Sequence, residues 1–414
     1  MLLTTIAAQL LAGAPGEGTK WTHWGGPTGD FHVTGPPLVE AWPESGPKRL
    51  WEIELGEGFS GIVCDGERLY TAYSEEGSEI VVALDREDGS LVWDHAYEAG
   101  KYADVTDHFG KGPYATPLLI GDRLVTTGIA GKVTCLKAKS GDPCWTLDLH
   151  EKFGRQKRRE EYGYSGIPLE YGGKILVPVG GDQHAVVALD PTDGSMVWGS
   201  APGRVSYAPQ TLVRLCGMDQ LVYFSPTEVI GLDPTDGKQL WSFPVVCVTE
   251  NNLTPVAPCA EDHLWVACQL DGGTRELKIT REEGAFRATA VWQDRAMKQG
   301  HWPSIVLGDY LYGSLGDSSS MFSAVNWRTG EVAWKERLFH AAQMLYADGR
   351  IVLIDESGQV AMVRVTPAGP SVLCTAQVLE SVAWTVPTLV DGVLYVRDRK
   401  HVVALDLAKS SYDG

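Results

Sequence analysis

One sequence pattern recurs along this chain and constrains its fold more than any other feature. It consists of a small residue, a Leu-Asp pair, a short turn that contains Gly, and a Trp four residues after that Gly. Pro191 suits the first corner of a type I turn, and Gly194 suits the left-handed position that closes it. The pattern predicts two strands joined by a tight turn. Clear copies span 83–93, 188–198 and 231–241, and degraded copies span 135–145 and 324–334.

The spacing of the copies predicts the architecture. With two fainter copies near Ile279 and Val363 and a last Leu-Asp pair at Leu405, eight units fill roughly residues 46–409, at about 45 residues each, the length of a four-stranded propeller blade. In these segments apolar and polar residues alternate with a period of two, and Val, Ile, Tyr and Trp are frequent. Both features favour strands over the helices of other repeat proteins. We therefore predict an all-β fold, an eight-bladed β-propeller of four-stranded antiparallel blades.

The two ends of the repeat region complement one another. The last unit starts at Trp384 and has three strands, whereas residues 50–55 are expected to form a lone outer strand that contains its Trp, Trp51. Pairing of this strand with residues 401–407 closes the ring and removes an open sheet edge. We expect the N-terminal strand to complete the last blade in this way.

The remaining segments lie at the ends of the chain. Residues 1–14 are apolar and end in small residues, as secretory signals do, although no Lys or Arg precedes the apolar run. We expect export to the periplasm, with a cytoplasmic protein as the alternative. Residues 15–45 combine Gly and Pro with four large aromatic residues, which predicts an ordered strap against the propeller and not a free linker, with a ligand lid as the alternative. Residues 410–414 form a short tail.

The repeat also carries a family resemblance. Its Ala-x-Asp-x-x-x-Gly-x-x-x-Trp form resembles the tryptophan-docking motif of pyrroloquinoline-quinone (PQQ)-type eight-bladed propellers, which quinoprotein alcohol dehydrogenases and BamB-type lipoproteins carry. Over residues 21–407 the chain looks like the bacterial PQQ-like β-propeller repeat proteins of the planctomycete type. Those proteins begin with a segment like 21–29 and end with one like 384–398. The resemblance implies the fold and leaves the function open, because one propeller hosts unrelated activities.

Two classes of function follow from the resemblance. The first is a non-catalytic scaffold without cofactor or metal that binds a protein or extended peptide at the channel face or a blade edge, in the cell envelope. The alternative is a PQQ-dependent oxidoreductase of alcohols or sugars that uses the axial channel. Such enzymes typically carry two adjacent cysteines and large insertions, whereas this chain of 414 residues has no adjacent cysteines. We therefore favour the scaffold.

Charge and hydropathy exclude other partners. The net charge of −18 argues against a nucleic-acid partner and suits a soluble monomer. No stretch reaches the ~18 consecutive apolar residues of a membrane-spanning helix. The single basic run, residues 155–159, is expected at the rim of the channel, either as a contact for an anionic group or as a solvated loop beside Glu160 and Glu161.

Residues just before each inner strand are expected to converge at the mouth of the axial channel. Aromatic rings and amides gathered there suit a sugar, a peptide or a quinone, and the alternative is that they fill the channel and satisfy one another. Their geometry does not follow from sequence, so no catalytic residue is assigned. The predicted ligand-binding residues are Tyr114, Tyr164, Tyr207, Asn251, His301, Trp302, Gln343 and Trp384.

Two cysteines are placed for a disulfide. Cys135 and Cys144 flank a turn and are expected on facing strands, so an oxidising compartment would allow them to pair. The other six cysteines are expected as small core residues. No spacing of Cys and His indicates a zinc site.

Overall fold

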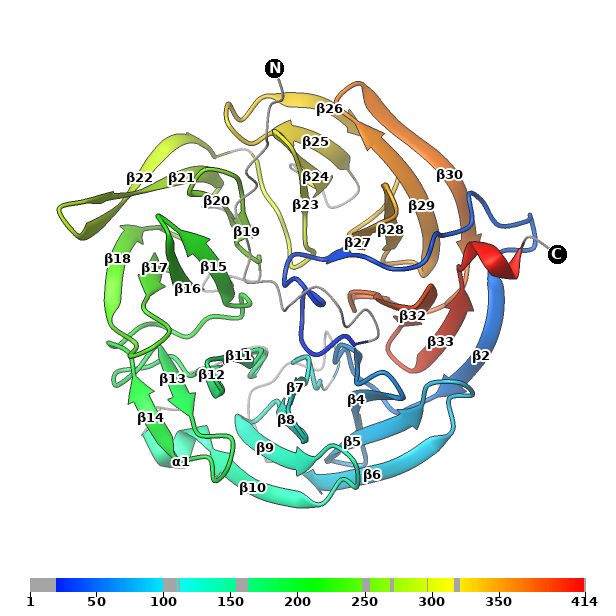
Figure 1. Cartoon of the computed structure of the whole chain (residues 1–414), viewed down its shortest axis with the longest axis horizontal. Helices are drawn as coiled ribbons and strands as arrows, with labels where there is room; N and C mark the ends of the chain where they lie inside the picture. Colours follow the sequence, from blue (N-terminus) through cyan, green and yellow to red (C-terminus); the bar gives the residue numbers. More distant parts are fainter. Residues whose placement is uncertain are drawn as a thin grey trace.

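The computed structural model consists of eight blades in a ring (Figure 1), each a four-stranded antiparallel sheet, to one of which the N-terminal segment adds a fifth strand. It describes residues 20–99, 110, 112–153, 163–247, 254–268, 272–295, 297–315 and 321–412. One short α-helix, α1 (Leu149–Phe153), and one 3-10 helix, Lys409–Ser411, accompany the strands. The predicted eight-bladed propeller is therefore confirmed.

The strands run outward from the axis in chain order within each blade. Blades 1 and 2 consist of β3 (Val63–Cys64), β4 (Arg68–Glu75), β5 (Ser78–Asp85) and β6 (Leu91–Glu98), then β7 (Leu118–Ile120), β8 (Arg123–Thr127), β9 (Lys132–Lys137) and β10 (Pro143–Asp148). Blades 3 and 4 consist of β11 (Leu169–Tyr171), β12 (Lys174–Pro178), β13 (Val186–Leu189) and β14 (Met196–Gly199), then β15 (Thr211–Leu215), β16 (Met218–Phe224), β17 (Glu228–Leu232) and β18 (Gln239–Pro244).

The second half of the ring repeats this order. Blades 5 and 6 consist of β19 (Ala257–Pro258), β20 (His263–Ala267), β21 (Thr274–Glu282) and β22 (Ala285–Asp294), then β23 (Ile305–Leu307), β24 (Tyr310–Ser314), β25 (Phe322–Asn326) and β26 (Val332–Glu336). Blades 7 and 8 consist of β27 (Gln343–Ala347), β28 (Arg350–Ile354), β29 (Gln359–Thr366) and β30 (Gly369–Gln377), then β31 (Thr388–Val390), β32 (Val393–Arg397), β33 (His401–Asp406) and β2 (Lys48–Glu54).

The ring closes as the sequence predicts. Strand β2 lies antiparallel to β33, with Lys48 opposite Asp406 and Glu54 opposite His401. The last blade thereby obtains its outer strand from the N-terminal part of the chain. Closure joins distant parts of the sequence in one sheet and leaves no open edge between the first and last blades.

The repeated Trp contacts the turn of the following blade. Trp93 of blade 1 donates its indole N–H to the Ala138 carbonyl of blade 2 at 3.0 Å, and Trp145 of blade 2 donates to the Pro191 carbonyl of blade 3 at 2.9 Å. The facing turn residue is Gly141 or Gly194, where a Cβ would lie within 2.7 Å of the indole. Both indoles therefore stack on backbone that only glycine leaves exposed.

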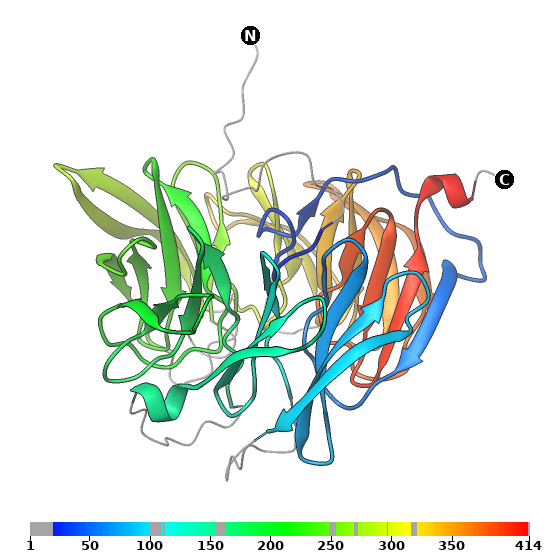
Figure 2. The ribbon, with the colours of Figure 1, turned by 60° about the horizontal axis from the view of Figure 1, so that its bottom comes forward.

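Residues 20–47 run from the centre of the ring outward over blades 7 and 8, as the blue segment in Figures 1 and 2 shows. Strand β1 (His32–Val33) lies parallel to β27, so blade 7 has a fifth strand on its inner edge. Further along, the Trp42 indole N–H donates to the Thr375 carbonyl of β30 at 3.2 Å. Trp21 and Trp42 are both buried. Within the described ranges, neither helix has the length and apolar character needed to span a bilayer.

Candidate functional site

The inner strands begin around one end of the axial channel and surround a cavity of about 490 Å³ there. In six blades, the residue exactly four positions before the inner strand lines this cavity, because the repeat brings the same position of each blade to the axis. Blade 7 contributes Gln343 instead, the first residue of its inner strand. The six residues are Phe59, Tyr114, Ser165, Tyr207, His301 and Trp384.

Six of the eight residues predicted for this site line the cavity. They come from blades 2, 4, 6, 7 and 8, so residues near the starts of inner strands from distant parts of the chain lie around one cavity. The remaining prediction for blade 5, Asn251, lies outside the described residues, as does the basic run at 155–159. The six residues are Tyr114, Tyr207, His301, Trp302, Gln343 and Trp384.

The structure does not bring Tyr164 to the cavity. Its buried ring packs edge-on against the His150 ring, with 5.5 Å between centroids, and over Gly131. Tyr164 lies five positions before its inner strand, and neighbouring side chains of an extended segment point to opposite sides. Its neighbour Ser165 occupies the lining position. Counting four positions back from each inner strand would have selected Ser165 and Phe59.

The N-terminal segment supplies a part of the site that sequence reasoning missed. Trp24 and Phe31 line the cavity and meet edge to face, with ring centroids 4.6 Å apart. Both also line a larger groove, of about 1440 Å³, formed by the ends of the inner strands on the opposite face. The two rings therefore stand between the cavity and the groove. In the sequence, the Trp-x-x-Trp segment at 21–24 is the feature that could have indicated a contribution of the N-terminal segment to this site.

Aromatic rings form most of the wall. The Phe59 ring lies nearly parallel to the Tyr114 ring at 5.9 Å and is 5.1 Å from the Trp384 ring. The His301 ring contacts Trp302 and Trp384 at 5.1 and 5.4 Å. These contacts fix the wall before any ligand enters, so little side-chain entropy remains to be lost on binding.

Two residues of the lining carry buried polar atoms without partners. Gln343 is completely buried, and neither its amide oxygen nor its amide nitrogen has a hydrogen-bond partner in the part of the chain that the structure describes. The Nε2 atom of His301 is also buried and unpartnered there. Burial lowers the pKa of His301 to about 4, so its imidazole is neutral at physiological pH. Together these groups offer a donor and at least one acceptor to a neutral ligand.

The charge of the lining comes from one carboxylate. Glu356 accepts a hydrogen bond from the Trp384 indole at 2.6 Å, and its other oxygen lies 2.5 Å from Nδ1 of His340. Among the described lining residues there is no Lys or Arg. The cavity therefore favours neutral or cationic groups over anions.

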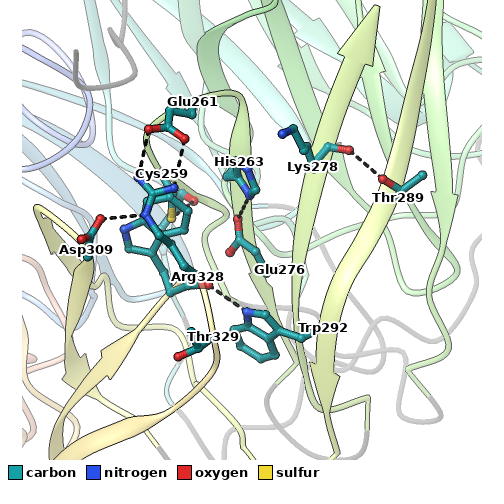
Figure 3. A network of polar contacts seen from close by, with 12 residues as sticks. Cys259, Glu261, His263, Glu276, Lys278, Thr289, Trp292, Asp309, Arg328 and Thr329 are labelled. Atoms are coloured by element: carbon teal, nitrogen blue, oxygen red, sulfur yellow. Dashed lines mark hydrogen bonds and ion pairs between the residues drawn. The ribbon is translucent and has the colours of Figure 1, made fainter. Parts of the chain in front are cut away.

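A second polar cluster joins blades 5 and 6 beside the groove of the opposite face (Figure 3). Arg328 contacts both carboxylate oxygens of Glu261 at 3.0 and 3.1 Å and Asp309 at 2.8 Å, which links turns of adjacent blades. This cluster is a cross-link on the surface, and its exposed ion pairs contribute little free energy.

Behind it, buried Glu276 lies 3.1 Å from Nδ1 of His263. Burial raises the pKa of Glu276 well above its usual range, and burial also lowers the pKa of His263. No group of three or more His, Cys, Asp or Glu residues suited to a metal ion occurs in the described ranges.

The cysteines that were predicted to pair are not bonded in this structure. Cys135 of β9 lies opposite Trp145, and Cys144 falls at a β-bulge, where the register shifts between Pro143 and Trp145. Burial, and next the nearby Cys144 thiol, raise the pKa of Cys135 to about 12. The disulfide between them stays a prediction.

Comparison with known proteins agrees with this geometry. The family model described as outer membrane protein assembly factor BamB matches residues 77–336. BamB from Moraxella catarrhalis superposes with a TM-score of 0.59 at 16% identity, over 87% of this chain and 99% of that one. Quinohemoprotein alcohol dehydrogenase from Comamonas testosteroni superposes with a TM-score of 0.63 at 11% identity, over 94% of this chain and 81% of that one.

One curated relative shows similarity in sequence. Quinohemoprotein alcohol dehydrogenase ADH-IIG from Pseudomonas putida is 25% identical over 171 residues, which are 38% of this chain and 22% of the enzyme. The match thus spans about a fifth of that enzyme's length. The structural likenesses show the fold alone, whereas the family model covers more than half of the chain. The chain therefore belongs to the BamB-type family of PQQ-like β-propeller proteins.

Proposed function

We propose that this protein is a non-catalytic binding scaffold of the cell envelope that holds an extended segment of a partner protein in the cavity at the channel mouth. The observation that carries the proposal is the buried amide of Gln343, which has no partner among the described residues. A buried polar group without a partner costs about 1–3 kcal/mol, a cost that is recovered when a ligand supplies the partner.

An extended peptide fits the polar groups of the cavity. Its backbone presents a donor and an acceptor, and the side-chain amide of Gln343 can bond both at once. The aromatic wall suits an apolar side chain of the peptide, and about 490 Å³ lies within the usual size of a small-ligand pocket. A neutral peptide segment also avoids repulsion from Glu356.

The lining does not fit pyrroloquinoline quinone, the cofactor of the alternative function. This quinone carries three carboxylates, and the described lining offers them no Lys or Arg. Glu356 would add a like charge, and an uncompensated buried carboxylate is costly.

The location in the envelope rests on the apolar N-terminal residues 1–14 and on membership of the BamB-type family. Export is tested by fusing residues 1–30 to a reporter enzyme that is active only outside the cytoplasm. Reporter activity equal to that of a fusion without these residues contradicts export.

Binding is tested by panning a phage-displayed library of random linear peptides against the full chain. Selected peptides are then titrated while the fluorescence of the pocket tryptophans is followed. Gln343→Leu keeps the side-chain volume but removes both polar atoms, so we expect at least a tenfold loss of affinity. Arg328→Ala, on the opposite face, serves as the matched control and should bind normally.

Two outcomes count against the proposal. If every selected peptide binds Gln343→Leu as tightly as the unaltered protein, the cavity is not the site. If the protein with added quinone and calcium reduces a redox dye in the presence of an alcohol or sugar, the proposed scaffold function is wrong and the protein is an oxidoreductase.

A further inference from the structure

Two cysteines that belong to no sequence motif lie side by side between blades 4 and 5. Cys247 follows the outer strand β18 of blade 4, and Cys268 follows β20 of blade 5 directly. Their Sγ atoms lie 2.7 Å apart, and both side chains are buried. Even non-bonded carbon atoms prefer about 3.5–4.0 Å, and sulfur is larger, so this approach is too close for two thiols that merely pack.

The backbone holds both cysteines in place. The Cys247 N–H donates to the Pro226 carbonyl at 3.0 Å, and the Cys268 N–H donates to the Gly273 carbonyl at 2.9 Å. At Gly272 a Cβ would lie 2.3 Å from Sγ of Cys268, so the sulfur occupies space that exists only beside glycine. The short distance between the two sulfurs is therefore set by the backbone around them.

The surroundings of the pair are apolar. Cys247 and Cys268 belong to a core cluster with Val245, Val256 and Val266. A disulfide carries no charge and is therefore stable among apolar side chains. No cluster of metal-ligating side chains includes them within the described ranges.

We propose that Cys247 and Cys268 form a disulfide that staples blade 4 to blade 5. The oxidant is a disulfide-bearing thiol oxidant, as oxidising compartments contain. The thiolate of one cysteine attacks the oxidant's disulfide and releases one of its sulfurs as a thiol. The second cysteine then attacks the mixed disulfide, so that one sulfur–sulfur bond forms in the protein and two electrons and two protons end on the oxidant. Because both sulfurs are buried, the exchange takes place while the chain folds.

The bond would close a loop between residues 21 positions apart, which includes residues 248–253 ahead of the inner strand of blade 5. Closing a loop of this length restricts the unfolded chain. For a protein of this size, the expected rise in Tm is about 4 °C. This inference is independent of the proposed ligand.

The test uses the full chain, produced in an oxidising compartment, with thiols blocked by N-ethylmaleimide at lysis. Cleavage after glutamate places the three nearby cysteines in separate peptides. Mass spectrometry then detects a disulfide as two peptides that remain joined. Cys247 falls in peptide 229–250, Cys259 in 251–261 and Cys268 in 262–276. We expect 229–250 joined to 262–276, and 251–261 carrying the blocking group.

Recovery of Cys247 and Cys268 with the blocking group, or joined to other cysteines, overturns the proposal. As a second measurement, dithiothreitol should lower the Tm of the unaltered protein by about 4 °C and leave that of Cys268→Ser unchanged. Cys259→Ser is the control and should keep the full shift. A joined peptide without any shift in Tm overturns the stapling role.

Discussion

Replacing Gln343 with Leu should stabilise the protein while it removes ligand binding. The side chain is completely buried, and neither of its polar atoms has a partner among the described residues. Each such group costs about 1–3 kcal/mol, and Leu has a similar volume without that cost. We expect a gain of about 1–3 kcal/mol in the free energy of unfolding. Unfolding entropies of about 2 cal/mol/K per residue convert this gain to a Tm roughly 1–3 °C higher for 414 residues.

The assay is thermal and urea unfolding of the full chain without ligand, with Gln210→Leu as a matched control. Gln210 is also buried, and its amide oxygen has no partner among the described residues, but its amide nitrogen donates to the Leu176 carbonyl at 2.8 Å and the Ile167 carbonyl at 3.3 Å. The same substitution there removes these two hydrogen bonds and should lower the Tm. A lower Tm for Gln343→Leu as well would refute the reasoning, because it would mean that the Gln343 amide is satisfied in the free protein.

Two further predictions concern the contacts between blades and the stability of the protein at acidic pH. Gly141→Ala should cost about 2–4 kcal/mol, because φ is +74° and the new Cβ would lie 2.6 Å from the Trp93 ring. Gly121→Ala, at φ +59° with open space, should cost only about 1–2 kcal/mol, and equal losses in urea unfolding would contradict the indole contact. Burial lowers the pKa of His301 from 6.5 to about 4, so between these values the unfolded chain binds the proton more readily and stability falls as the pH falls. The free energy of unfolding should drop by about 1–2 kcal/mol from pH 7 to pH 5 through this residue, and His301→Phe should show a drop smaller by that amount.

The positions of the candidate site follow from the repeat to a large extent. Inner strands converge on the axis, so a residue at a fixed distance before them reaches the mouth in six of the blades. Tyr114, Tyr207, His301 and Trp384 were found for that reason. Tyr164 was misplaced because it is one position out of step, and one step along an extended chain reverses the side-chain direction.

Other features required the folded chain. The path of residues 20–47 depends on contacts with blade 7, hundreds of residues away in the sequence, and no local pattern encodes the pairing of β1 with β27. The placement of Trp24 and Phe31 at the axis follows from that path. The approach of Cys247 to Cys268 likewise depends on how two blades pack, and Cys135 with Cys144 had the more obvious spacing.

The sequence by itself determined the blade number, the strand order and the closure of the ring by β2, because periodic hydrophobic and turn residues act locally and repeat. Only the tertiary structure decided which polar groups at the mouth lack partners. Hydrogen-bond satisfaction depends on every neighbour within about 3.5 Å, and these neighbours come from several blades at once. That is why Gln343 could be placed at the mouth from the sequence, whereas its buried, unpartnered amide emerges only when the blades and the N-terminal segment are packed together.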